Sequence, residues 1–129
     1  MSEFVTFEIA KKLKEKGFIL DYNLYGYKPI YTDVNTIALI WNNGAYEKDY
    51  FGENIPCPTI SQVLKWLREE KKLFVEVYMY NSHYLWEIYN TEIIDVDLTQ
   101  KSEKYSEEEF QTYEKAALAG IEYVLDNLI

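Results

Sequence analysis

The sequence predicts an α+β fold, in which a small antiparallel sheet has a β-hairpin over residues 73–90 at its centre. About three helices are expected to pack mainly on one face of that sheet. Three observations carry the prediction: apolar residues at helical spacing in three segments, alternating residue types over 73–90, and turn signals between these elements. A length of 129 residues suits a single domain, 1–129, with one hydrophobic core.

The first two helices are predicted over residues 7–16 and 59–72. Thr6 stands directly before the first segment and Thr59 opens the second, and both are capping residues. Gly17 suits the position after a helix, where a left-handed backbone conformation is common. Apolar residues recur every three or four positions at Val5, Ile9 and Leu13 in the first segment and at Ile60, Val63, Leu64 and Leu67 in the second.

The segment between these helices is rich in tyrosine, and residues 19–54 predict turns and short irregular strands. An apolar run at 37–41 is β-like and ends at the turn signal of residues 42–44. Residues 55–58 contain two prolines and must therefore be extended.

The hairpin over 73–90 is the clearest β-signal. If Asn81 and Ser82 form a two-residue turn, the two strands agree on which face is apolar. The core face would then carry Leu73, Val75, Val77, Met79, Tyr84, Trp86 and Ile88. Residues 94–98 alternate apolar residues with Asp95 and Asp97, which predicts a short third strand.

The other face of the hairpin is aromatic where an ordinary solvent-facing sheet would be polar. It forms a possible interaction surface, made by Phe74, Tyr78, Tyr80, Leu85 and Tyr89. Either residues 19–54 cover this face or it is a contact surface. We favour intramolecular cover, because the tyrosine-rich segment otherwise has no place to bury its own rings.

Glu76 and Glu87 form a weak candidate carboxylate pair. The two-residue turn places them directly opposite each other, where like charges are destabilising. Two close carboxylates could bind a cation or act as an acid/base pair. A four-residue loop would instead pair position 78 with 87 and 76 with 89. We favour this second register because exposed strand glutamates are ordinary.

The last helix is predicted over 106–128, with Ser106 and Glu109 forming a capping box. Its apolar stripe runs through Phe110, Tyr113, Ala117, Ile121, Val124, Leu125 and Leu128. Gly120 interrupts that stripe at a cost of about 1 kcal/mol relative to alanine. We therefore expect helix and sheet to approach each other closely at Gly120.

The net charge of −9 comes from the second part of the chain. Residues 1–72 hold ten acids and ten bases, whereas residues 73–129 hold twelve acids and three lysines. Such a surface repels phosphates, so we expect no direct binding of nucleic acid, and it favours basic partners or cations. A merely solubilising surface is the simpler interpretation, and we favour it.

No catalytic, cofactor-binding or metal site is predicted. The sequence has no glycine-rich phosphate loop, no Cys-x-x-Cys and no His-Glu-x-x-His. A nucleophilic pair of Cys57 and His83 is the remaining option. It is disfavoured because Cys57 stands between two prolines and His83 belongs to the polar end of the hairpin.

The single cysteine excludes an intrachain disulfide, and the chain starts without the basic stretch and apolar run of a signal peptide. Its apolar runs are far shorter than a membrane span. We expect a cytoplasmic protein that does not associate with membranes.

Three blocks carry a resemblance: residues 4–18, which begin Phe-Val-Thr-Phe-Glu-Ile-Ala; residues 55–69, which begin Ile-Pro-Cys-Pro-Thr; and residues 113–129, which begin Tyr-Glu-Lys-Ala-Ala. Together they are similar to small uncharacterised proteins from prophages and mobile elements of Bacteroides-type bacteria. The resemblance implies a phage-associated origin and no catalytic residues. The tyrosine-rich residues 19–54 depart from it.

These observations favour a small noncatalytic protein-interaction module that binds a protein partner, or a second copy of itself, through aromatic and acidic surface. One alternative is an acidic mimic of nucleic acid that inhibits a basic host protein. It would need carboxylates spaced like phosphates along the last helix. The other is a carboxylate-based enzyme or cation-binding protein that uses Glu76 and Glu87.

Overall fold

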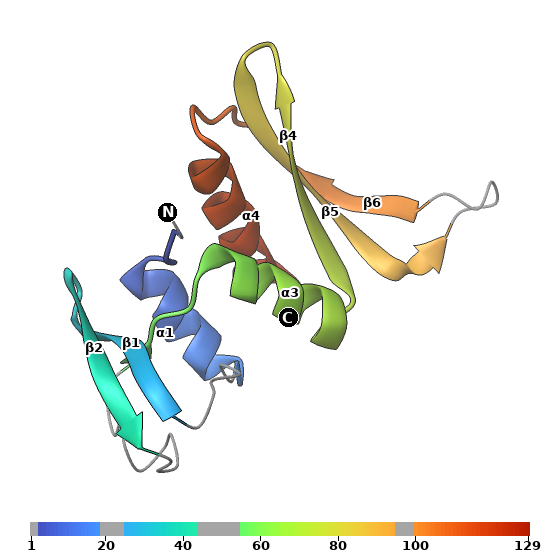
Figure 1. Cartoon of the computed structure of the whole chain (residues 1–129). Coiled ribbons are helices and arrows are strands. Elements are labelled where there is room, and N and C mark those ends of the chain that lie inside the picture. The colour runs from blue at the N-terminus through green and yellow to red at the C-terminus, as the bar shows by residue number, and fades with distance from the viewer. Residues whose placement is uncertain (1–2, 19–24, 44–54, 95–99) are drawn as a thin grey trace. The chain divides into compact units, whose positions relative to one another are not determined.

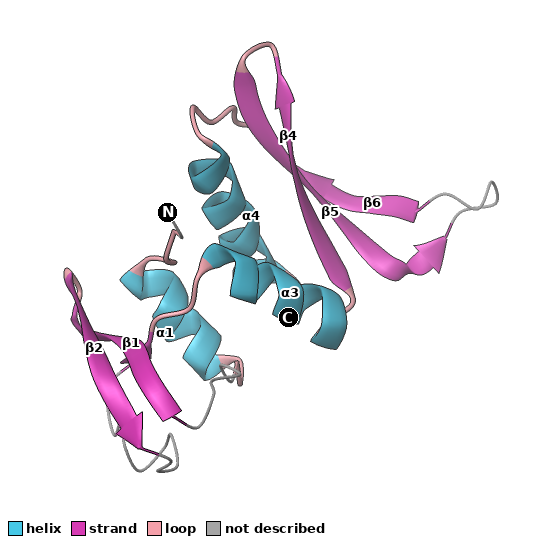
Figure 2. Ribbon diagram, in the orientation of Figure 1, coloured by secondary structure: helices cyan, strands magenta, loops and turns pink. Residues whose placement is uncertain are grey.

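The computed structural model describes residues 3–18, 25–43, 55–94 and 100–129, and within these it confirms an α+β fold of three helices and two three-stranded antiparallel sheets (Figures 1 and 2). The chain groups into two compact units, residues 2–59 and 60–129, and each unit is described by itself. The organisation as one domain over 1–129 stays a prediction.

Helix α1 (Phe7–Glu15) opens the first unit and forms where the sequence predicts it. The Thr6 hydroxyl accepts a hydrogen bond from the Ile9 N–H at 3.3 Å, which satisfies one of the free donors of the first turn. The helix ends at Glu15 with Lys16 as its C-cap, and Gly17 follows with a φ of +84°, a left-handed conformation that glycine adopts without strain.

The described part of the tyrosine-rich segment forms a hairpin of two long strands, with one register shift between Tyr31 and Asp33, and not short irregular strands. Strands β1 (Tyr25–Asp33) and β2 (Thr36–Asn43) pair antiparallel, and β3 (Ile55–Pro56) adds to the other side of β1. Pro29 does not interrupt the sheet, because its carbonyl still accepts a hydrogen bond from the Cys57 N–H at 3.1 Å. The extended conformation predicted for residues 55–58 is thereby confirmed for β3.

The second unit contains α3 (Ile60–Glu70), β4 (Leu73–Tyr80), β5 (His83–Ile94), β6 (Gln100–Tyr105) and α4 (Tyr113–Asn127). Its strand order is β4-β5-β6, so the second strand of the predicted hairpin is the central one. Helix α4 packs against β4 and β5, and α3 packs against β4. The expectation of one sheet is thus corrected to two, of which the hairpin belongs to the second.

The third strand of this sheet lies later in the chain than predicted. Ile94, expected to begin it, is the last residue of β5, and β6 occupies Gln100–Tyr105. Residues 95–99 lie outside the described part of the chain. The strand predicted from the alternation at 94–98 therefore stays a prediction beyond Ile94.

The predicted start of the last helix at Ser106 is wrong. Helix α4 begins at Tyr113, and the Thr112 hydroxyl caps it by accepting a hydrogen bond from the Lys115 N–H at 3.1 Å. The preceding residues run beside β5 instead. A capping-box pattern reports local preference only, and here a long-range pairing overrides it.

Ser106 and Phe110 form hydrogen bonds with backbone N–H and C=O groups of β5 on the side of that strand away from β4. The Ser106 N–H donates to the Trp86 carbonyl at 2.9 Å, and the Trp86 N–H donates to the Ser106 hydroxyl at 3.1 Å. Phe110 exchanges two hydrogen bonds of 2.8 Å with Tyr84. The segment between β6 and α4 thus covers a strand edge that would otherwise offer unpaired donors and acceptors.

The predicted core face of the hairpin is buried at the end nearest the helices. Val75, Trp86 and Ile88 are buried, whereas Met79 near the tip is 63% exposed. The close approach expected at Gly120 is confirmed, because a Cβ atom placed there would lie 2.9 Å from Val75 Cγ1. Glycine at this position lets α4 lie directly on the sheet.

Candidate functional site: the outer face of the β4–β5 hairpin

The hairpin turns through two residues, Asn81 and Ser82, whose φ angles are +50° and +65°. Positive φ at both positions is the geometry that matches the twist of a two-residue hairpin. Met79 therefore faces Tyr84, and Glu76 faces Glu87. The four-residue loop favoured from the sequence is wrong, and the opposed glutamates are a feature of the sheet.

We call the side of the hairpin away from α4 the outer face. It carries the five residues of the predicted interaction surface together with both glutamates: Phe74, Glu76, Tyr78, Tyr80, Leu85, Glu87 and Tyr89. Tyr80 is 61% exposed and Tyr78 is 37% exposed, while the other three members of the predicted surface are partly buried. The structure therefore brings together every residue of that surface.

Cross-strand pairing explains how the aromatic side chains are arranged. Phe74 lies opposite Tyr89, and Tyr78 lies opposite Leu85, with the two glutamates as the pair between them. Aromatic residues paired in this way stabilise a sheet by about 0.2–1 kcal/mol per pair. The outer face is thus an aromatic surface with two carboxylates at its middle.

The two carboxylates help to raise the pKa values of Tyr89 and Tyr78. The Tyr89 hydroxyl donates to Glu87 Oε2 at 2.8 Å. This hydrogen bond, followed by burial and by the charges of Glu87 and Glu76, raises the pKa of Tyr89 to about 12. Burial, followed by the same two charges, also raises the pKa of Tyr78. Both carboxylates therefore act on the same small area of the sheet.

Tyr105 is a neighbour of the carboxylate pair that the sequence reasoning missed. It is paired with Glu87 across β5 and β6 and is 61% exposed. It was missed because residues 100–105 were not assigned to a strand. The signal that could have found it is the aromatic residue in the polar run that precedes the last helix.

The chemistry of the outer face suits a cationic ligand. Within the described residues, neither Glu76 nor Glu87 forms an ion pair with a lysine or arginine. No group of three or more His, Cys, Asp or Glu in that part of the chain is arranged to hold a metal ion. Two carboxylates framed by aromatic rings are chemically suited to a cationic group, through charge and through the negative faces of the rings.

The hypothesis that residues 19–54 cover the outer face stays a prediction. Residues 19–24 and 44–54 lie outside the described residues, and the hairpin of β1 and β2 belongs to the other unit.

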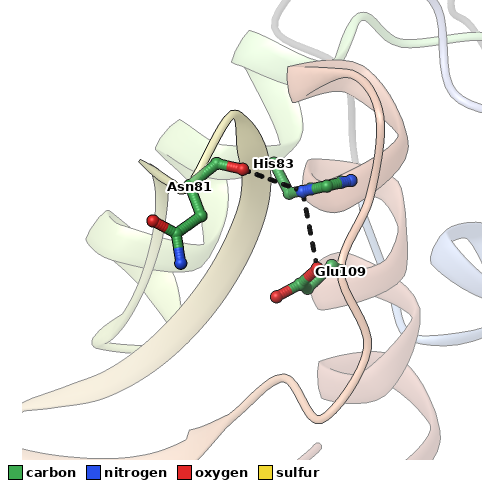
Figure 3. Close-up of polar contacts among 3 residues, drawn as sticks. All are labelled: Asn81, His83 and Glu109. Carbon is green, nitrogen blue, oxygen red and sulfur yellow. Dashed lines mark hydrogen bonds and ion pairs between the residues drawn. The ribbon is translucent and has the colours of Figure 1, made fainter.

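Cys57 and His83 each have partners within their own unit. Cys57 is fully buried beside the Tyr31 hydroxyl, and burial raises the pKa of its thiol to about 11. The His83 Nδ1 lies 3.0 Å from the Asn81 carbonyl and 3.5 Å from Glu109 Oε2. Figure 3 shows the two contacts. A buried, protonated thiol is a poor nucleophile, so the structure offers no support for this pair as a catalytic site.

The comparisons with known proteins identify no relative: no family model, no curated protein and no solved structure matches the chain. Among the residues that the structure describes, no helix has the length and apolar character needed to cross a membrane.

Proposed function

We propose that this protein is a small noncatalytic interaction module, phage-derived and cytoplasmic, whose outer face binds a basic surface on a protein partner. The observation that supports the proposal best is the composition of that face. Exposed tyrosines surround two opposed carboxylates that no described cationic side chain neutralises.

The aromatic side chains favour a protein as the partner. Tyrosine provides a large, rigid contact area together with a polar group, and for this reason it is enriched in protein interfaces. Tyr80 and Met79 project at the tip of the hairpin, where they are 61% and 63% exposed. Apolar area that is exposed in the free protein and covered in a complex contributes binding free energy.

The charge of the chain favours a basic partner. Twelve acids and three lysines lie in residues 73–129, so the part of the chain that contains the outer face has a strongly negative net charge. The negative potential that results steers a positively charged partner toward the surface and weakens as salt screens it. Glu76 and Glu87 supply the pair of carboxylates that a lysine or arginine at the centre of the interface would contact.

The test is a pull-down of the tagged protein from host-cell lysate at low and high salt, with bound proteins identified by mass spectrometry. The double variant Tyr78→Ala/Tyr80→Ala should lose the enriched partner. Tyr113→Ala, which removes a tyrosine that is 42% exposed on α4, is the matched control and should retain it. Equal enrichment with both variants would refute binding through the outer face.

Self-association is distinguished in the same experiment. If the only enriched species is an untagged copy of the chain, light scattering should give a dimer mass for the original protein and a monomer mass for Tyr78→Ala/Tyr80→Ala. That result would replace the hetero-complex by a symmetric homodimer.

An acidic mimic of nucleic acid is the second candidate, supported by the uneven charge. The shorter α4 weakens it, since Glu107, Glu108 and Glu109 precede the helix and leave Glu114, Glu122 and Asp126 along it. A mimic would bind its partner with a steep salt dependence that is insensitive to Tyr78→Ala/Tyr80→Ala.

A cation site at Glu76 and Glu87 is the third candidate, supported by their direct opposition in the sheet. The variant Glu76→Gln distinguishes a cation site from a pair of carboxylates that merely repel each other. Removing repulsion should raise the free energy of unfolding by a few tenths to about 1 kcal/mol. A thermal shift with Mg²⁺ or Ca²⁺ in the original protein that the variant loses would instead indicate a cation site. The control is Glu92→Gln, which removes a carboxylate from an exposed position of β5.

A further inference from the structure

An open cavity of about 410 Å³ lies in the second unit, where α4, the end of β6 and the segment that follows it meet. It is on the side of β5 that faces α4, because Trp86 lines it and alternates with Leu85 and Glu87 of the outer face. Its volume is within the range typical of sites for small groups.

Four aromatic residues line this cavity, Trp86, Tyr105, Phe110 and Tyr123, and the rings of Trp86 and Tyr123 pack together. Trp86 comes from β5 and is almost fully buried, and Tyr123 comes from α4. Their ring centroids lie 5.3 Å apart, and their planes are tilted by 35°. The faces of such rings carry partial negative charge and attract cations.

Carboxylates surround the rings. The lining includes Glu107 and Glu108 from the segment before α4, together with Glu122 and Asp126, which are four residues apart and so lie on one side of the helix. Lys104 is the one cation among the described lining residues. The cavity therefore combines an aromatic wall with an excess of negative charge.

Lys104 shows which kind of group this arrangement accepts. Its Nζ lies 6.0 Å from the centroid of the Tyr123 ring and 3.5 Å from Glu107 Oε1. The ion pair is exposed at the surface, since the Glu107 side chain is 81% exposed, and such pairs contribute little to stability. A side chain held so weakly can be exchanged for a better-fitting cation.

We propose that this cavity binds an arginine side chain of a basic polypeptide, which displaces Lys104 from the Tyr123 ring. A planar guanidinium stacks on an aromatic face and pairs with carboxylates through several donors at once, whereas an ammonium interacts as a point charge. Arginine thus uses both features of the cavity. The cavity lies on the α4 side of the sheet, shares only Tyr105 with the surroundings of the outer face, and does not depend on the function proposed for that face.

The test is an NMR titration of the full-length ¹⁵N-labelled protein with the peptide acetyl-Gly-Arg-Gly-amide. The expected result is saturable shifts of the Trp86 indole N–H and the Tyr123 amide. The same peptide with citrulline in place of arginine is nearly isosteric but neutral, and it should leave these signals unchanged. Equal shifts with both peptides would overturn the inference.

Variants locate the binding in the cavity. Lys104→Gln removes the competing cation and should tighten binding by about threefold, the scale of an exposed ion pair. Lys115→Gln makes the same charge change on exposed α4 outside the cavity and is the matched control. If the two variants change the dissociation constant equally, general charge explains the binding and the inference fails.

A second pair of variants covers the case in which Lys104→Gln disturbs folding. Glu122→Gln should weaken arginine-peptide binding by about threefold relative to Glu92→Gln, which removes the same charge away from the cavity. Equal effects would again overturn the inference. The variant Tyr78→Ala/Tyr80→Ala should bind the peptide normally, so failure of the outer-face proposal and failure of this one give different results.

Discussion

Gly120 is the residue at which helix α4 comes closest to its sheet. A Cβ atom at this position would lie 2.9 Å from Val75 Cγ1 and 3.2 Å from Trp86 Cγ. Alanine would gain about 1 kcal/mol of helix propensity. Overpacking a well-packed core costs about 1–3 kcal/mol. We therefore expect Gly120→Ala to lower the free energy of unfolding by about 1 kcal/mol, measured by urea denaturation.

The cause of that loss can be tested with a second substitution. Val75→Ala removes the Cγ1 atom that the new methyl group would meet, so Gly120→Ala should cost less in this background than in the original protein. A stabilised Gly120→Ala variant would show that helix and sheet are less close than the structure indicates.

Cys57 provides a test of burial in the first unit. Its thiol is fully buried, and burial raises its pKa from 9.0 to about 11. The folded state thus keeps a proton that the unfolded chain loses first. The stability contributed by the thiol is complete below about pH 9 and is lost as the pH rises toward 11.

Two measurements follow from this protonation. Iodoacetamide at pH 8 should label the native protein many times more slowly than the urea-unfolded protein, because the native thiol is both inaccessible and protonated. Between pH 8 and 10, the free energy of unfolding should fall more steeply for the original protein than for Cys57→Ala. Rapid labelling of the native protein would reopen Cys57 as a nucleophile.

Among the secondary-structure elements, helix α4 has two candidate N-caps in the sequence, Thr112 and Ser106, and substitutions can distinguish them. The Thr112 hydroxyl accepts the hydrogen bond that a cap requires. Thr112→Ala should therefore lower the free energy of unfolding by about 1 kcal/mol. Glu109→Ala removes the second half of the pattern predicted at Ser106 and should change it by less than about 0.5 kcal/mol. The reverse order would place the helix start at Ser106.

Local signals predicted those elements that are determined locally. Helices α1 and α3 begin and end within two residues of the expected positions, because capping residues and apolar spacing act within one helix. Ser106 and Phe110 pair with residues of β5 that lie 20 and 26 positions earlier in the chain. Propensity carries no information about such a partner, so the local cap was preferred in error.

The candidate site was predicted in part for the same reason. Alternation over 73–90 placed Phe74, Tyr78, Tyr80, Leu85 and Tyr89 on one face, and the structure has them there. The pairing register of β4 and β5 depends on the length of the turn between them. The turn has positive φ angles at Asn81 and Ser82, which asparagine tolerates but serine does not specify, so the sequence did not determine its length. The acidic, aromatic cavity beside α4 was not predicted, since it depends on the unexpected path of residues 104–110.

In the molecule as a whole, the two units differ strongly in net charge. Residues 60–129 carry fourteen acids and seven bases, a net charge of −7, whereas residues 2–59 carry eight acids and six bases, a net charge of −2. Repulsion among like charges destabilises a compact state, and salt screens it over about 10 Å at 0.1 M. The two units should therefore respond differently to ionic strength.

We expect salt to stabilise the second unit selectively. Raising NaCl from about 10 mM to about 200 mM shortens the screening length roughly fourfold, from about 30 Å to about 7 Å. Amide protons of α4 and β5 should then exchange more slowly in native-state hydrogen exchange, while those of α1 and β1 change less. The first unit is the internal control, because a general effect of salt on hydrophobic burial would slow exchange in both. Equal slowing in both units would mean that salt acts generally and not by screening repulsion within the acidic second unit, which would contradict the prediction.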